Sequence, residues 1–498
     1  MLDIDRVGRD IENLYSELEL DTWENRTGRK DETNEAAIRE KYSHLASKPL
    51  FEQIAIARET ATGELAKRLR YIAEMIGTTF VTFEVKELSD QANAKKSKGT
   101  VEIDGVPTPF NELLPKIYNE ADRSKRAKLY NSRNNFIGRD LNPILMQRMH
   151  GLHSAAVSLG YPSYTQMYQD LMGVDLEELY KQFRLLIEKT DDIYFTEMNA
   201  RMEKIAGVEL EKAEKHDLYL TLRVKELDKY FPKEKLVETF RKTFLGMGID
   251  LEGLPNVNLD LEERPKKVPR AFTALVRVPS DIRLVIKPQG GVNDYRTFGH
   301  EGGHTLHLAH TDSLLPPEFK ILGDISVTES YAGLLEGLTR DPEWLQEMLG
   351  IKEVKPIMDA QKFLRFYMTR RYGAKLGYEI ELHQQNRLKD LLNMPESYNE
   401  ALERALVFKH PRTNFLIDVD DAFYGIYYLK SFILEAQLQN YLERNFGGRW
   451  WENPESGEFL KSLWGLGQKY DANEMAQRLG YSGLDIQPVI SDYQSYFS

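Results

Sequence analysis

The chain of 498 residues contains no cysteine. This absence excludes disulfide bonds, and any zinc site must be built from histidine and carboxylate side chains. The sequence also has no apolar run approaching 18 residues, so we expect no membrane-spanning segment. The N-terminal residues Met1–Arg6 lack the basic and apolar regions of a signal peptide. Together these absences predict a cytoplasmic protein.

An excess of positive charge is absent as well. The chain has 66 basic against 78 acidic residues, a formal net charge of −12. Phosphate groups repel an acidic chain, so we expect neither nucleic acid nor an anionic membrane as a partner. The basic run at residues 93–99 has no interleaved aromatics and is interpreted as a solvated loop. The length predicts two or three domains and leaves the oligomeric state open.

Helical periodicity dominates the first part of the chain. From Met1 to about Gly77, apolar residues recur at helical spacing. Residues Thr79–Val85 and Val101–Ile103 are predicted to be strands, the second ending in a turn at Asp104-Gly105. Helices resume at about residue 111 and are expected to continue to residue 248.

One long helical element is predicted within that region. Asp175 begins a capping-box-like start, and an apolar stripe then continues towards Ile205. The residues of the stripe are Leu179, Phe183, Leu186, Tyr194 and Met198. We expect these side chains to pack in the core, on one wall of a deep cleft.

The clearest strands are Ala271–Val278 and Asp281–Lys287, predicted to form a small antiparallel sheet. Their edge either pairs with a substrate backbone or only supports the helix that follows. The stretch 254–270 is rich in proline and charge and is a predicted linker. We therefore divide the chain into a helical half with a small β-hairpin, residues 1–265, and a second half, residues 266–498.

The most informative motif is His300-Glu301-x-x-His304. Two histidines four residues apart project from the same face of a helix and can share one metal ion. Glu301 is turned by about 100° from the first histidine and can take a proton from a water on that ion. The two glycines inside the motif cost about 1 kcal/mol each, which suits close approach of another backbone such as a substrate strand. Asn293 is the predicted N-cap of this helix.

A catalytic zinc site needs a third protein ligand, and two candidates follow the motif. His310 fits the pattern HExxHxxGxxH, except that His307 replaces the glycine at which the chain turns. In an unbroken helix His310 would lie about 15 Å from the first histidine and face away. The other candidate is Glu329, on a second helix that Ser326 or Thr328 is predicted to cap.

These motifs resemble those of the thimet oligopeptidase and oligoendopeptidase F family of zinc metallopeptidases. The shared pattern is His300-Glu301-x-Gly303-His304-x-x-His307, with Glu329 25 residues after His304 and Glu336 seven residues later. Two segments, Arg270-Ala271-Phe272 and Pro288-x-Gly290-Gly291, are similar to the stretch that leads into that family's active-site helix. The pair Tyr424-x-x-Tyr427 is similar to the family's transition-state tyrosines. The resemblance covers roughly residues 265–440.

The resemblance implies a mainly α, elongated zinc-peptidase fold with a small antiparallel sheet beside the active-site helix and a deep substrate cleft. It implies one Zn2+ per chain and hydrolysis of internal bonds of short peptides. It implies that His300, His304 and Glu329 bind the metal and that Glu301 is the general base. Tyr427 and Tyr424 would donate hydrogen bonds to the oxyanion. Glu336 would orient a ligand histidine, and His307 would contact substrate or support the ligands.

The sequence departs from the family pattern at two places. Family members have a histidine a few residues before the tyrosines, where Phe415 and Leu416 lie here; His410 is too distant to be its equivalent. The family also has a large residue where Gly302 stands. These departures bear on efficiency and substrate preference and leave the metal triad intact.

Two alternative functions stay open. Arg270-Ala271-Phe272, Asp281-Ile282-Arg283 and Glu329-Ser330 distantly resemble the thermostable zinc metallocarboxypeptidases. That family has histidine where Arg270 and Thr328 stand here. From a different class, the chain would be a catalytically impaired peptide-binding protein whose metal is structural or lost.

Overall fold

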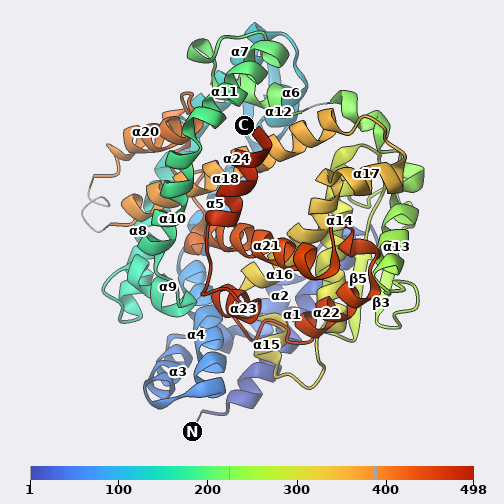
Figure 1. Cartoon of the computed structure of the whole chain (residues 1–498). Coiled ribbons are helices and arrows are strands. Elements are labelled where there is room, and N and C mark those ends of the chain that lie inside the picture. The colour runs from blue at the N-terminus through green and yellow to red at the C-terminus, as the bar shows by residue number, and fades with distance from the viewer. Residues whose placement is uncertain (1, 224, 385–389, 498) are drawn as a thin grey trace. The chain divides into compact units, whose positions relative to one another are not determined.

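A computed structural model describes residues 2–223, 225–384 and 390–497 of the chain (Figure 1). The chain forms two compact units, each assembled from three stretches. The first unit comprises Met1–Ile76, Lys225–Lys362 and Tyr427–Pro488, and the second comprises Gly77–Val224, Phe363–Ile426 and Val489–Ser498. Each unit therefore takes residues from both sides of residue 265. Both units are mainly helical with one small sheet, which confirms the predicted mainly α class.

The first unit contains a three-stranded sheet and the helices around it. Its elements are α1 (Ile4–Arg26), α2 (Glu35–Lys41), η1 (Ser43–Ala46), α3 (Lys48–Thr60), η5 (Lys225–Tyr230), η6 (Lys233–Lys235), α13 (Leu236–Gly246), β3 (Val257–Asp260), β4 (Phe272–Arg277), β5 (Asp281–Val285), α14 (Val292–His310), α15 (Pro317–Ile321), α16 (Ile325–Gly337), η7 (Leu338–Arg340), α17 (Pro342–Leu349), η10 (Trp450–Glu452), α22 (Pro454–Trp464) and α23 (Ala472–Arg478). Four helices have residues in both units: α4 (Gly63–Glu84), α18 (Lys355–Leu382), α21 (Gly425–Phe446) and α24 (Gln487–Phe497).

The second unit is a helical assembly with one β-hairpin. Its elements are α5 (Lys86–Lys98), β1 (Thr100–Ile103), β2 (Val106–Pro109), α6 (Phe110–Asn119), α7 (Arg123–Phe136), η2 (Ile137–Leu141), α8 (Asn142–Ser158), α9 (Tyr164–Met172), α10 (Leu176–Lys189), α11 (Asp191–Arg201), η3 (Met202–Ala206), η4 (Leu210–Lys212), α12 (Lys215–Leu222), α20 (Met394–Leu406), η8 (Arg412–Asn414) and η9 (Asp421–Phe423). The hairpin confirms the strand predicted at Val101–Ile103 and its turn at Asp104-Gly105. In the described part of the chain, no helix is both long and apolar enough to cross a membrane.

The sheet of the first unit has the strand order β3-β5-β4. β4 and β5 are antiparallel, with Thr273 opposite Leu284, and confirm the two strands predicted there. β3 runs parallel to β5, with Val257 opposite Ile282. The sheet is therefore mixed and not antiparallel as predicted, because the stretch 254–270, taken for a linker, supplies a third strand.

The two faces of this sheet pack against different helices. One face lies against α1 through a cluster of Trp23, Phe272, Ala274, Val276 and Val285. The other face lies against α14 through Val278, Ile282, Leu308 and Ala309. Burial of each large apolar side chain contributes about 1.5–3 kcal/mol. The sheet thus fixes the position of α14, and Figure 1 shows β3 and β5 beside it.

Two predictions for residues 79–99 are wrong. Thr79–Val85 is not a strand: α4 continues through Glu84, and Val81 and Val85 are buried four residues apart. The hydroxyl of Thr82 donates to the carbonyl oxygen of Thr78 at 2.9 Å, which accommodates a β-branched residue within the helix. The basic run is not a loop, because α5 extends to Lys98, where cationic side chains favour a helix C-terminus.

The long element predicted from Asp175 is two helices. The capping prediction is confirmed, since the Asp175 side chain accepts from the backbone N–H of Glu178, and all five stripe residues are buried. α10 ends before Thr190, however, whose N–H bonds to the carbonyl oxygen of Ile187 and not to the residue one turn earlier. Arg370 donates to the same carbonyl at 2.9 Å. The stripe therefore belongs to the core of the second unit but not to one continuous helix.

Candidate metal centre

The histidine motif lies on α14 (Val292–His310), which is unbroken along its length. The helix is entered through Gly290 and Gly291, whose φ angles of 86° and 95° favour glycine. Gly291 is the N-cap, so the prediction of Asn293 is wrong. The carboxylate of Asp294, in the first turn, accepts from the N–H of Gly290 at 2.7 Å and ties the entry loop to the helix.

α16 packs on α14 so closely that only glycine fits at the contact. A Cβ added at Gly303 would lie 2.6 Å from both the Cα of Ala332 and the carbonyl oxygen of Tyr331. A Cβ at Gly299 would lie 2.9 Å from the carbonyl oxygen of Leu335. The backbone that approaches Gly303 is thus that of α16 and not a substrate strand. This close approach brings the side chains of α16 within reach of the histidines.

The start of α16 is fixed by Asp324, so the predicted caps Ser326 and Thr328 are wrong. The Asp324 carboxylate accepts from the N–H of Ser326 at 3.1 Å and from the N–H of Ala472 at 2.9 Å. Burial acts to raise the pKa of Asp324, but its ion pair with Lys430 lowers it. An ionised carboxylate at this position stabilises the N-terminus of the helix.

Three side chains from the two helices converge: His300, His304 and Glu329. The carboxylate of Glu329 lies between the two imidazoles, 3.5 Å from His300 Nε2 and 3.8 Å from His304 Nε2. The two rings are nearly perpendicular, with centroids 4.9 Å apart. All three side chains keep some exposure, 25%, 16% and 11% respectively, so the cluster is open to solvent.

The spacing of these atoms suits a divalent metal ion. In a tetrahedral zinc site, bonds of about 2.0–2.1 Å place ligand atoms roughly 3.3 Å apart. The three candidate ligand atoms lie within 4.8 Å of one another, and the carboxylate of Glu329 lies 3.5 and 3.8 Å from the two imidazole nitrogens. Two imidazoles and one carboxylate are a common ligand set for catalytic zinc. The residues present therefore fit such an ion.

A hydrogen-bond chain through Thr328 fixes the proton on His304. His307 Nε2 lies 3.3 Å from the carbonyl oxygen of Gly467, which can only accept, so that nitrogen carries a proton. Burial lowers the pKa of His307 to about 4, so its ring is neutral and its Nδ1 accepts from the Thr328 hydroxyl at 3.0 Å. The hydroxyl oxygen then accepts from His304 Nδ1 at 2.8 Å. Neutral His304 is left with a lone pair on Nε2, the atom that faces Glu329.

Glu336 has the corresponding role for His300. Its Oε2 lies 3.2 Å from His300 Nδ1, and its Oε1 accepts from Arg296 at 2.6 Å. Burial acts to raise the pKa of Glu336, but the charge of Arg296 and the contact with His300 hold it well below its usual value. Burial acts to lower the pKa of His300, and Glu336 and Glu329 together raise it. The ionised Glu336 therefore orients His300 with Nε2 towards Glu329.

Thr273 on β4 holds Glu301 at two points. The backbone N–H of Thr273 donates to Glu301 Oε2 at 2.9 Å, and its hydroxyl donates to the backbone carbonyl oxygen of Glu301 at 2.8 Å. β4 is an edge strand, and at Thr273 its N–H is engaged by the protein itself. Burial raises the pKa of Glu301, which suits a carboxylate that accepts and releases a proton.

No protein-family model and no curated protein matches this chain. The likeness to the peptidase family therefore rests on the motifs of residues 265–440 alone.

The remaining predicted site residues make other contacts. His310 ends α14, where its Nδ1 donates to the carbonyl oxygen of Leu306, and it is not part of the three-residue cluster found among the described residues. Tyr427 is buried in α21, and its hydroxyl donates to the carboxylate of Glu74. Tyr424 belongs to the second unit and is 40% exposed. His307 is fully buried, which favours support of the ligands over substrate contact.

Three residues were not assigned a role at the metal site from the sequence: Thr328, Arg296 and Thr273. Each acts through a contact between elements far apart in the chain, so no local spacing indicates it. The nearest available signal was the position of Thr328 directly before Glu329. A hydroxyl on the helix that carries a ligand is placed to reach the neighbouring imidazoles.

Proposed function

We propose that this protein is a zinc-dependent oligopeptidase that hydrolyses internal bonds of short peptides. The observation that carries the proposal is the cluster of His300, His304 and Glu329. The hydrogen bonds that run from Gly467 through His307 and Thr328 to His304 leave the lone pair of His304 Nε2 facing the carboxylate. A zinc ion at such a site polarises a carbonyl group and makes bound water acidic.

Glu301 supplies the acid–base function in this proposal. Glu301 lies on the helix that carries two of the ligands, and its carboxylate is held by the backbone N–H of Thr273 on β4. The carboxylate takes a proton from the attacking water and delivers it to the leaving amine. Its raised pKa, which burial causes, brings proton transfer in both directions closer to neutral pH.

Tyr427, in the same unit as the metal cluster, is the proposed donor to the oxyanion. The single phenol proton of Tyr427 is donated to Glu74 in this structure, so stabilising an oxyanion requires that bond to break. Burial raises the pKa of Glu74 to about 7. A protonated Glu74 no longer needs the phenol proton and leaves it for another acceptor.

The test uses a short peptide blocked at both ends. Zinc is expected at one ion per chain by elemental analysis; a chelator should abolish cleavage and zinc restore it. Glu301→Gln should keep the metal and lower turnover by about 10²–10⁴-fold. Glu343→Gln, an exposed glutamate on α17, is the matched control and should retain full activity.

Each result separates the proposal from its alternatives. Internal cleavage of the blocked peptide excludes an obligate carboxypeptidase. Bound zinc without turnover of the blocked peptide favours a catalytically impaired peptide-binding protein. Full activity of Glu301→Gln would contradict the assigned mechanism.

A further inference from the structure

A second group of buried polar atoms lies in the second unit, whereas the metal cluster belongs to the first. Glu214 and Lys409 form an isolated parallel β-bridge. Both of these residues are exposed, whereas the residues that follow them, Lys215 and His410, are 6% and 3% exposed. Because the two backbones run side by side in the same direction, Lys215 and His410 both point inward from adjacent positions.

The terminal polar atoms of these two side chains have no protein partner among the residues that the structure describes. Lys215 Nζ makes neither a hydrogen bond nor an ion pair, and His410 Nε2 is buried without a hydrogen bond. His410 Nδ1 lies 3.1 Å from the carbonyl oxygen of Phe408, which can only accept, so the proton of the neutral ring is on Nδ1. His410 Nε2 is therefore an acceptor without a donor, and the charge of Lys215 acts on this ring.

The charges around Lys215 do not compensate it. The groups that act on it are one carboxylate, Asp418, and three cations, Arg371, Arg133 and Lys375. Burial lowers the pKa of Lys215 to about 8, so the amine is still mostly protonated at neutral pH. A buried ammonium within an excess of positive charge is costly unless an anion accompanies it.

The carboxylate that acts on Lys215 is already engaged. Asp418 forms an ion pair with Arg371 through one oxygen and accepts from the Tyr398 hydroxyl at 2.8 Å through the other. Both oxygens of Asp418 thus have donors other than Lys215.

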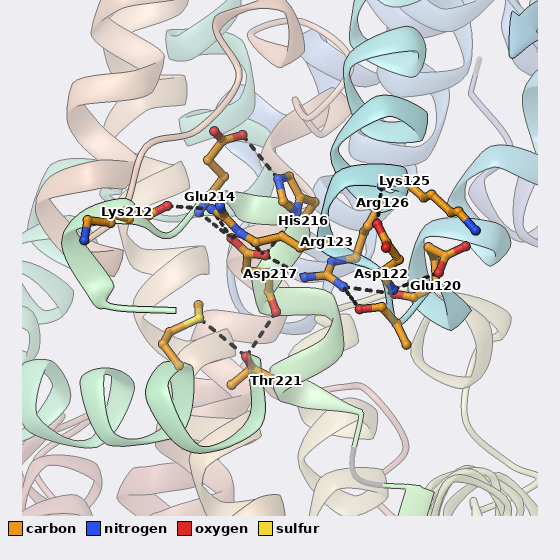
Figure 2. A network of polar contacts seen from close by, with 12 residues as sticks. Glu120, Asp122, Arg123, Lys125, Arg126, Lys212, Glu214, His216, Asp217 and Thr221 are labelled. Atoms are coloured by element: carbon orange, nitrogen blue, oxygen red, sulfur yellow. Dashed lines mark hydrogen bonds and ion pairs between the residues drawn. The ribbon is translucent and has the colours of Figure 1, made fainter. Parts of the chain in front are cut away.

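Asp217, two residues along α12, is saturated in the same way. Figure 2 shows its carboxylate enclosed by Arg123 and Arg126, at 3.1 and 2.7 Å, with His216 at 3.2 Å. This carboxylate pairs with the buried guanidinium of Arg126 and the more exposed one of Arg123, and accepts from the N–H of Glu214 as well. It has no remaining capacity for Lys215.

We propose that Lys215 and His410 form a binding site for a small oxyanion that carries a hydroxyl proton. A negatively charged oxygen accepts from Lys215 Nζ, and the hydroxyl donates to His410 Nε2. Hydrogen phosphate and a hydroxycarboxylate share this chemistry. The site is independent of the metal centre and of any peptidase activity.

Isothermal titration calorimetry on the full chain at neutral pH tests this site, with ionic strength held constant by sodium chloride. Inorganic phosphate and lactate are titrated separately, and saturable binding of one ion per chain is expected for at least one of them. Binding of phosphate alone identifies a phosphate ligand, and binding of lactate alone identifies a hydroxycarboxylate. Acetate, which lacks the hydroxyl proton, should bind at least about tenfold more weakly.

Lys215→Met should weaken the binding at least about tenfold, because it removes a charged hydrogen-bond donor while keeping the side-chain volume. Lys212→Met, an exposed lysine paired with Glu209 on the same segment, is the matched control and should bind as the unmodified chain does. His410→Phe provides a second variant if Lys215→Met does not fold, and it too should lose affinity. The absence of saturable binding to the unmodified chain, or unchanged affinity in Lys215→Met, would overturn the proposal.

Discussion

Replacing Gly303 with alanine tests how closely α14 and α16 must approach for the metal cluster to form. The added Cβ would lie 2.6 Å from the Cα of Ala332. Carbon atoms in contact prefer a separation of about 3.5–4.0 Å, so one helix must move by about 1 Å. The obstacle is backbone and not a flexible side chain, so no rotamer change relieves it.

The substitution should affect metal binding as well as folding. Overpacking costs about 1–3 kcal/mol, but alanine in place of glycine returns about 1 kcal/mol of helix propensity. The free energy of unfolding should therefore fall by no more than about 2 kcal/mol. Metal sites, by contrast, tolerate ligand displacements of only about 0.2 Å. A shift of Glu329 with α16 should weaken zinc binding by at least about tenfold.

The assay is competition for zinc against a chromophoric chelator, with thermal unfolding measured on the metal-free protein. Gly448→Ala is the control, since a Cβ at that exposed glycine meets no atom within 4 Å. Gly303→Ala with unchanged zinc affinity and unchanged stability would refute the argument that glycine is needed for helix contact.

Two further predictions concern the hydrogen bonds beneath the cluster and a buried acid. Thr328→Val should lower zinc affinity by about 10–100-fold, because His304 loses the acceptor that fixes its proton. Thr297→Val on α14 is the control. Equal zinc affinities of the two variants in a chelator titration would contradict the hydrogen-bond chain. Burial raises the pKa of Glu74 from 4.5 to about 7, so the folded state holds a proton that the unfolded state releases between these values. The associated stability, about 3 kcal/mol, is full below pH 4.5 and is lost as the pH rises to about 7. Urea unfolding at about pH 5 and about pH 7.5 should show a smaller loss of stability in Glu74→Gln than in the unmodified chain, because Glu379 and other buried carboxyls still contribute; an identical loss in both would contradict the prediction.

Much of the fold around the site follows from local sequence patterns. β4 and β5 alternate apolar and polar residues and were predicted within one or two residues of their ends. Thr79–Val85 was wrong because its β-branched and aromatic residues have strand propensity, whereas burial of Val81 and Val85 at helical spacing is a tertiary property. β3 was missed because its pairing with β5 depends on a distant partner.

In the candidate site, too, local features could be predicted from the sequence and contacts between distant elements could not. The spacing of His300 and His304 on one helix is local and can be found from the sequence alone. The position of Glu329 beside them depends on how α16 crosses α14, which Gly299 and Gly303 permit but do not specify. The roles of Thr328 and its partners come only from folded geometry.

The C-terminal stretch of the first unit completes the metal-site helices. The carbonyl oxygen of Gly467 terminates the proton chain from His304, and the N–H of Ala472 binds Asp324 at the start of α16. During translation, both histidines leave the ribosome more than 150 residues before these groups exist. The metal centre therefore forms only late in synthesis. A chain that ends before residue 467 would lack the carbonyl group that determines which nitrogen of His307, and through Thr328 of His304, carries the proton.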